Sequence, residues 1–133
     1  MIPNAHITIY NQYIDPETRF PKWQRAEVFN CVWQGVSAIS KFKEQVPADT
    51  ILILIPSASG LAYQEPIAWQ ADKDSGWTLQ EGDVIVRGLT EDEITDDFTI
   101  TDLRKSHQYV AQIASIAHRG QGRFTAHWEV QAK

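Results

Sequence analysis

The chain has 133 residues, of which 43% are hydrophobic and 22% are charged, and its formal net charge is −5. This length suits one domain, which we place at residues 1–133, and the composition is that of a globular protein and not of a disordered one. An acidic chain lacks the basic face that binding to the outside of duplex DNA requires. We therefore expect no specific nucleic-acid binding.

Cysteine content and the absence of long apolar runs indicate the compartment. Cys31 is the only cysteine, so no disulfide can form within the chain, and a reducing cytosol suits it. Residues 1–6 show no positive region followed by an apolar run, and so predict no signal peptide. The strongly apolar stretch 51–55 is far shorter than the roughly 20 residues of a membrane-spanning helix. We expect a protein that is assembled in the cytosol.

Alternation of apolar and polar residues dominates the first part of the chain. Residues 5–13 place Ile7 and Ile9 on one face of a strand, and residues 15–19 around Pro16 predict a turn. Residues 22–34 predict a second, long strand with apolar side chains on both faces. A parity count gives Trp23, Phe29, Cys31 and Trp33 on one face, and Ala26, Val28 and Val32 on the other. Both faces of this strand are therefore expected to be covered.

The middle of the chain combines one clear strand with one irregular segment. Residues 35–48 are ambiguous, whereas residues 51–55 are a β-branched run stopped by Pro56 and predict a central strand. Residues 57–76 predict a long loop, which in a compact domain is usually functional or disordered. Its apolar side chains are Leu61, Tyr63, Ile67 and Trp69. We expect Trp69 to be an exposed interface anchor, because tryptophan dominates binding hot spots.

The last third of the chain predicts a short helix and three strands. Residues 81–83 form a turn before a strand at 84–88, and residues 101–105 start a helix with Thr101 or Asp102 as N-cap. Residues 109–117 and 123–131 form a hairpin. Its last strand turns Phe124, Ala126, Trp128 and Val130 inward. Roughly seven short strands predict a mainly β fold: a small antiparallel β-barrel or sandwich with at most one or two short helices.

The residues that could carry catalysis are scattered. Residues 57–60 (SASG) lack the first glycine of the G-x-S-x-G nucleophile motif, and Cys31 lies among apolar neighbours, where we expect a small buried hydrophobe. His127 and Glu129 match the H-x-E part of the zinc-deaminase motif, but its P-C-x-x-C part is absent. We expect a solvated pair and no catalytic residue.

Metal and phosphate sites are also not predicted. The histidines share no ligand spacing: His6, His107, His118 and His127. The acidic run lacks the order of a calcium loop and is expected to be solvated: Glu91, Asp92, Glu93, Asp96 and Asp97. Residues 120–122 (GQG) predict a hairpin turn in preference to a dinucleotide fingerprint, although the flanking Arg119 and Arg123 could contact phosphate. We expect no cofactor and no metal.

Three groups of residues carry a family resemblance. They are residues 4–11 (NAHITIYN) with 17–19 (ETR), residues 76–80 (GWTLQ) with 82–86 (GDVIV), and residues 127–130 (HWEV). In these motifs the chain resembles a family of small uncharacterised proteins of Firmicute phages and prophages, whose genes commonly lie in the head-to-tail morphogenesis cluster. The motifs lie near the start, middle and end, so the resemblance covers nearly the whole chain. The chain ends in Gln131-Ala132-Lys133 where members of the family end in Gly-Gly-Lys.

The resemblance implies a structural virion protein: a head–tail connector, head-closure or adaptor component that forms a ring on the portal or tail. Such a ring closes through heterologous contacts between copies. We expect the contacts with portal, connector or tail proteins in the segments 57–76, 91–97 and 118–123. The expected interface side chains are Leu61, Tyr63, Trp69, Glu91, Asp92, Glu93, Arg119 and Arg123. One alternative is a phage-encoded module that captures a host or defence protein; another is an enzyme that uses His127 and Glu129.

Overall fold

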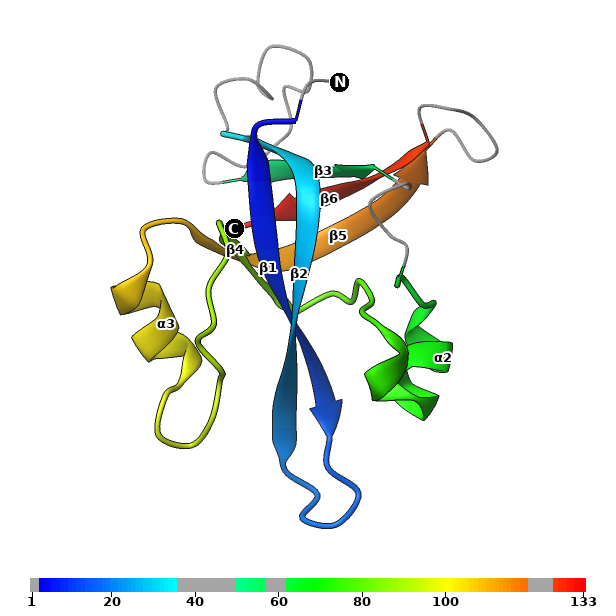
Figure 1. Cartoon of the computed structure of the whole chain (residues 1–133), viewed down its shortest axis with the longest axis vertical. Coiled ribbons are helices and arrows are strands. Elements are labelled where there is room, and N and C mark those ends of the chain that lie inside the picture. Colours follow the sequence, from blue (N-terminus) through cyan, green and yellow to red (C-terminus); the bar gives the residue numbers. More distant parts are fainter. Residues whose placement is uncertain (1–2, 36–49, 57–61, 120–125) are drawn as a thin grey trace.

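Six antiparallel strands close into a barrel in the order β1-β2-β3-β6-β5-β4 (Figure 1). The computed structural model describes residues 3–35, 50–56, 62–119 and 126–133. The strands are β1 (Ala5–Ile14), β2 (Pro21–Gln34), β3 (Ile51–Pro56), β4 (Val84–Arg87), β5 (Val110–Arg119) and β6 (His127–Ala132). The expectation of a mainly β fold is confirmed, and of its two forms the barrel is present. Within the described residues there are six strands where roughly seven were expected.

The interior of the barrel follows from the period-two pattern. Ile7 and Ile9 of β1 are fully buried, and Ile9 lies directly opposite Ile85 of β4. Trp128 and Val130 of β6 are buried in the same cluster, as their parity predicted. Because strand side chains alternate between two faces, each strand contributes its apolar face to this one core, and burial of that face drives folding.

A β-bulge in β2 corrects the parity prediction. The register between β1 and β2 shifts by one residue near His6, so that both Phe29 and Asn30 lie opposite this one residue. Asn30 has φ 62°, a left-handed conformation that asparagine tolerates better than most residues. As a result Val28 and Cys31 are both buried in the core, whereas Phe29 is 46% exposed. The prediction that Phe29 shares a face with Cys31 is therefore wrong.

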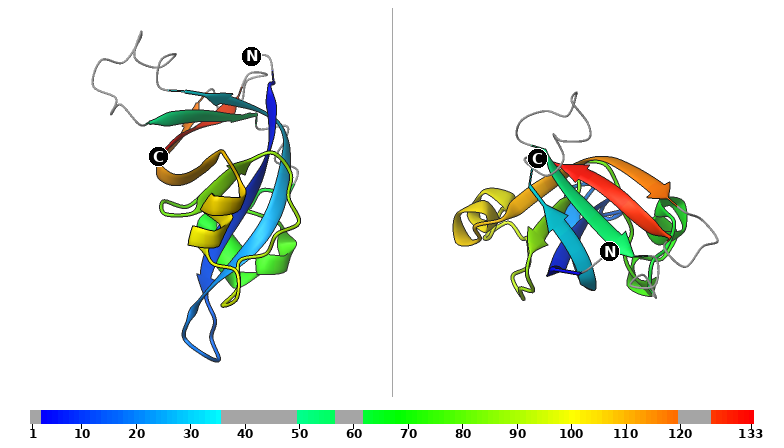
Figure 2. Two further views of the ribbon diagram at one scale, coloured as in Figure 1. Left: turned by 90° about the vertical axis from the view of Figure 1, so that its left-hand side faces the viewer. Right: turned by 90° about the horizontal axis from the view of Figure 1, so that it is seen from above.

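Helix α3 (Ile100–Ser106) and the segment before it cover part of the outside of the barrel (Figure 2). Tyr10, Val84 and Val86 turn away from the interior and are buried in a second cluster with Leu103 of α3. The Tyr10 hydroxyl donates to the backbone carbonyl of Asp92 at 2.7 Å, and burial raises the pKa of Tyr10 to about 12. Strand β1 is therefore covered on both faces.

The N-cap of α3 differs from the predicted one. Thr99 is the N-cap, two residues before Thr101, and Asp102 lies inside the first turn. The Asp102 N–H donates to Thr99 Oγ1 at 3.4 Å, while the Thr99 N–H donates to Asp102 Oδ2 at 2.9 Å. This reciprocal pair is a capping box, which satisfies N–H groups that a helix start leaves unpaired.

The segment expected to be irregular contains helix α2 (Pro66–Ala71) and a short 3₁₀-helix, η2 (Lys73–Ser75). Trp69 of α2 is fully buried, and its indole N–H donates to the carbonyl of Gly76 at 3.0 Å. The expectation that Trp69 is exposed on a loop is therefore wrong. Gly76 is required here, because a Cβ at this position would lie 1.7 Å from the carbonyl oxygen of Ala62. Ile67, by contrast, is 88% exposed.

Candidate functional site

Strands β1 and β2 continue past the barrel as a projecting hairpin. Strand β4 pairs only with residues 7–10 of β1, and β3 pairs only with residues 32–34 of β2. The pairing between β1 and β2 runs much further, as far as Ile14 opposite Pro21. The hairpin therefore extends beyond the ring of strands, between α3 on one side and α2 on the other (Figures 1 and 2).

The tip of this hairpin is a turn held by its own hydrogen bonds. The Asp15 N–H donates to the carbonyl of Phe20 at 3.0 Å, and the Arg19 N–H donates to the carbonyl of Asp15 at 2.7 Å. The Asp15 carboxylate pairs with the Lys22 amine at 2.8 Å, and this hydrogen bond holds the pKa of Asp15 below its usual value. Ile14 and Phe20 expose their apolar side chains here, Phe20 to 71%. The tip thus presents two apolar groups on a fixed backbone.

Buried polar side chains anchor the β1 side of the hairpin to the barrel. Asp83, which directly precedes β4, is only 2% exposed. Its Oδ1 accepts the backbone N–H of Gln12 at 3.1 Å, and its Oδ2 accepts Asn11 Nδ2 and Gln80 Nε2, each at 2.8 Å. Burial raises the pKa of Asp83, and these hydrogen bonds partly oppose that rise. Strand β4 begins only at Val84, opposite Tyr10, so at Gln12 the Asp83 carboxylate takes the place of a neighbouring strand.

Two asparagines of the first sequence motif have structural roles that the sequence did not reveal. Asn11 donates to the carbonyl of Thr78 at 2.8 Å and accepts the Thr78 N–H at 3.1 Å. Asn4 bonds both backbone groups of Trp33 in the same way, at 3.1 and 2.8 Å. Each side-chain amide thereby pairs with the N–H and the C=O of one residue, as the backbone of a neighbouring strand would.

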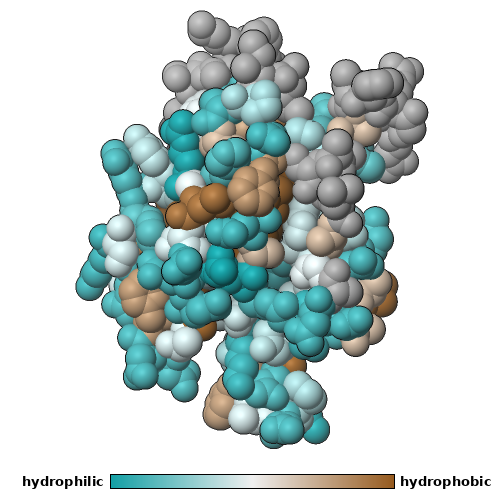
Figure 3. Space-filling model, in the orientation of Figure 1, coloured by the Kyte–Doolittle hydropathy of each residue, from teal (hydrophilic) through white to brown (hydrophobic). Residues whose placement is uncertain are grey.

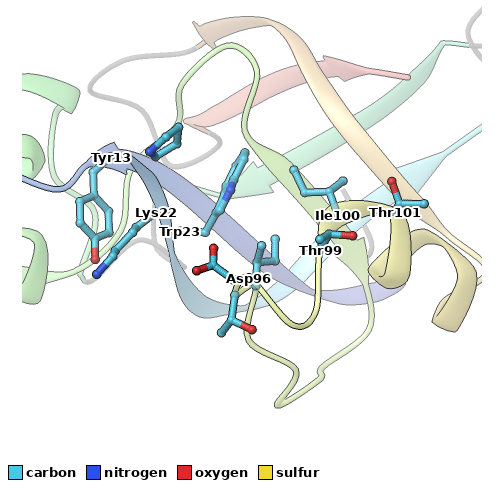
Figure 4. Close-up of a pocket in the computed structure, with 10 residues that line it drawn as sticks. Tyr13, Lys22, Trp23, Asp96, Thr99, Ile100 and Thr101 are labelled. Atoms are coloured by element: carbon cyan, nitrogen blue, oxygen red, sulfur yellow. The ribbon is translucent and has the colours of Figure 1, made fainter. Parts of the chain in front are cut away.

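A groove of about 610 Å³ lies on the other side of the hairpin, between β2 and residues 94–101 (Figure 4). The Trp23 side chain lies in the middle of this groove, with Lys22 on one side and Asp96 and Ile100 on the other (Figure 4). Ile94 adds a further apolar side chain to its lining. An aromatic side chain between aliphatic walls and opposite charges is suited to receive an apolar side chain from another molecule.

The predicted acidic interface segment is bonded to its own chain at two of its positions. Asp92 Oδ2 lies 2.9 Å from His107 Nε2, and this hydrogen bond lowers the pKa of Asp92. Glu93 lies 3.4 Å from the Arg25 Nε, and Glu91 is exposed. Among the described residues, no three histidine, cysteine or carboxylate side chains come together as a metal site would require.

The remaining predicted interface residues do not join this segment. Tyr63 is half-buried in an aromatic cluster, with ring centroids 5.2 Å from Trp77 and 4.4 Å from Trp128. Arg119 lies at the far end of β5, away from residues 91–97, and pairs with Glu129 at 2.8 Å. Leu61 and Arg123 lie outside the described residues. The predicted residues that the structure describes therefore lie at separate places on the barrel.

The candidate reactive groups are the thiol of Cys31 in the core and the pair His127 and Glu129 on one face of β6. Cys31 is buried in the core, and burial raises its pKa to about 12, so the thiol stays protonated. His127 and Glu129 lie on β6 with intermediate exposure.

In the parts of the chain that are described, no helix has the length and apolar character to cross a membrane.

Comparison with known proteins gives one match. No curated protein and no solved structure matches the chain. A family model, described as a family of unknown function (DUF6751), matches residues 2–133. Because this match spans nearly the whole chain, the protein belongs to the DUF6751 family.

Proposed function

We propose that this protein is a non-enzymatic structural protein of a tailed-phage particle, in which it joins head and tail as a connector, head-closure or adaptor component. The phage role is supported by the three sequence motifs, and the joining mode is supported by one structural observation. That observation is the projecting hairpin, whose fixed tip exposes Ile14 and Phe20 away from the barrel.

The tip has the properties of a docking element. Phe20 is a large aromatic side chain that is 71% exposed on a projection. Its burial in a pocket of a partner protein would lower the free energy of the complex. The turn hydrogen bonds and the Asp15–Lys22 pair already fix the backbone, so binding loses less conformational entropy than it would with a flexible loop. The hairpin therefore presents a preformed anchor to a portal, connector or tail protein.

The chemistry of the described residues supports a role without catalysis. The cysteine is a buried, protonated thiol, and Glu129 is paired with Arg119. The groove beside Trp23 has threonines, one lysine and one aspartate on its lining, and no histidine or cysteine. Nucleophilic catalysis requires a nucleophile beside an oriented base. The lining hydroxyl of Thr99 donates to the Asp102 carboxylate at 3.2 Å, and this carboxylate also accepts the Thr99 N–H in the capping box of α3, which gives the pair a structural role.

The experiment coexpresses the protein with the portal and tail proteins encoded beside its gene and measures copurification and the yield of joined particles. Phe20→Ser and Ile14→Ser should abolish copurification at unchanged thermal stability, because both side chains are already solvent-exposed. Ile67→Ser is the matched control, since Ile67 is also apolar and even more exposed, at 88%, but lies on α2.

Two results would refute the proposal. One is joining at the wild-type level by both tip variants. The other is capture of a host protein by the tip with no binding to particle proteins, which would favour the alternative of a phage-encoded binding module.

A further inference from the structure

The direction in which the backbone N–H and C=O groups of β1 point determines which backbone groups of the hairpin have no hydrogen-bond partner. The Gly88 N–H donates to the carbonyl of His6 at 2.6 Å, and the Gln12 N–H donates to Asp83. His6 and Gln12, which are both even-numbered residues of β1, thus turn their backbone groups toward β4 and away from β2. In an antiparallel strand successive residues alternate in this direction, so the odd-numbered residues of β1 bond to β2.

The register carries this alternation across to β2. Ile9 lies opposite Ala26, so the even-numbered residues of β2 face β1 up to the bulge. Trp23, Arg25 and Glu27 therefore turn their N–H and C=O groups to the outer edge of the hairpin. Within the described residues, no hydrogen bond reaches these backbone groups from that side. A row of unpaired backbone groups is a template for another strand.

We propose that this edge pairs with the same edge of a second copy of the chain, antiparallel, with Ala26 on the twofold axis. In this register Arg25 lies opposite Glu27 of the second copy, and Glu27 lies opposite its Arg25. A shift by two residues would place Arg25 opposite Arg25, or Glu27 opposite Glu27. Opposite charges directly across a strand pair stabilise it and like charges destabilise it. Within one chain Arg25 already lies 3.5 Å from Glu27 and 3.4 Å from Glu93, so the pairing brings a further glutamate to each arginine. The charge order of β2 is therefore complementary to itself in one register.

The same register explains the exposure of Phe29. Phe29 is 46% exposed on the outer face, where it meets only the edge of the His6 ring among the described aromatic rings, with centroids 5.2 Å apart. In the pairing it lies opposite Trp23 of the second copy, whose side chain lies in the groove of about 610 Å³. Phe29 of each copy thus enters the groove of the other. The bulge at Asn30 ends the regular strand, so the pairing extends from Trp23 to Phe29.

The test is sedimentation equilibrium of the full chain. The wild-type protein should show a concentration-dependent dimer. Arg25→Glu alone and Glu27→Arg alone place like charges opposite each other twice in the dimer, and each should raise the dissociation constant about tenfold or more. The double variant Arg25→Glu/Glu27→Arg should dimerise like the wild type. Glu81→Arg, in an exposed turn, is the control for the increase in net charge that Glu27→Arg makes.

A mixing experiment shows whether the two single variants are folded. Copies with Arg25→Glu present two glutamates, and copies with Glu27→Arg present two arginines. An equimolar mixture should therefore form a one-to-one heterodimer, although each variant alone stays monomeric. A wild-type protein that is monomeric at its highest soluble concentration would overturn the proposal, and so would a dimer that both single substitutions leave intact. The tip variants at Ile14 and Phe20 should keep the dimer, so that this test and the test of the joining function fail separately.

Discussion

Replacing Asp83 with alanine tests whether a buried carboxylate anchors the hairpin. The substitution removes three hydrogen bonds, but two of the donors keep another acceptor. Asn11 still bonds the carbonyl of Thr78 at 2.8 Å, and Gln80 still bonds the carbonyl of Gln12 at 3.2 Å. Only the Gln12 N–H loses its sole acceptor. An unpaired, fully buried donor costs about 1–3 kcal/mol, and this partly buried one should cost an amount near the lower end of that range. Since burial of a carboxylate is itself unfavourable, we expect a net loss of about 1–2 kcal/mol in the free energy of unfolding at neutral pH.

The pH dependence of this loss has a definite sign. Burial raises the pKa of Asp83 in the folded state above its unfolded value of about 3.9. The folded state therefore binds the proton more tightly, and the stability that this contributes is fully present below the unfolded pKa. It is lost as the pH rises through the folded pKa. The difference in stability between the wild type and Asp83→Ala should thus be largest in acid and shrink toward neutral pH.

Urea denaturation followed by tryptophan fluorescence, repeated across the acidic and neutral range, measures this difference. Asp83→Asn is the control: it cannot titrate, and it keeps an acceptor for the Gln12 N–H, so it should differ from Asp83→Ala by the same amount at every pH. A wild-type advantage that grows with pH would refute the reasoning. It would mean that the hydrogen bonds to the carboxylate outweigh its burial, and that the folded pKa is lowered.

The remaining predictions concern the interior and the bulge. Trp69→Ala should lower the free energy of unfolding by about 3–5 kcal/mol, whereas Ile67→Ala on the same helix should change it by less than about 0.5 kcal/mol; equal effects in denaturant titrations would contradict the burial of Trp69. Asn30→Gly should be nearly neutral and Asn30→Val should cost about 1–2 kcal/mol, because φ 62° is unfavourable for a β-branched residue. A tolerated valine, measured in the same titrations, would show that no left-handed residue is needed in β2.

The barrel strands could be predicted from the sequence because each one covers a common interior. Ile7 and Ile9 of β1, and Trp128 and Val130 of β6, repeat with the period of two that a strand requires. Residues 51–55 and the turn after Ile14 were equally clear. These signals are local, since a strand displays its face within a few residues.

Features that depend on one extra residue, or on an element of only a few residues, could not be predicted from such local periodicity. A count by two placed Phe29 on the same face as Cys31, because only the pairing with β1 reveals the bulge at Asn30. Helix α2 has six residues, too few for a helical period, and its one local sign was Pro66 in the first turn. The capping box could have been recognised in the sequence, since Thr99 precedes Asp102 by three residues.

The candidate site was harder to predict than the fold, because its contacts join distant parts of the chain. Asp83 bonds Asn11, which lies 72 residues earlier. Nothing in the composition near either residue indicates that the pair is buried. The predicted interface used exposed charges and loop aromatics instead, and of those Trp69 is in the interior. The role in a phage particle rests on the motifs and stays a prediction.

Closure of the barrel determines where this chain can pair with another through its backbone. Each strand of the ring has a neighbour on both sides, but within the described residues strand edges remain where β1 and β5 extend beyond β4 and where β2 extends beyond β3. On β1 this edge is occupied, because Asp83 and Gln80 bond the backbone of Gln12. On β2, Arg25 and Glu27 turn their backbone groups outward without such a cover. Proteins that protect an edge place charged side chains, bulges or covering side chains along it, and the β2 edge has both charges and a bulge. Pairing is favoured on β2 because its charges are complementary to themselves in one register, and because this register brings the exposed Phe29 to the groove beside Trp23.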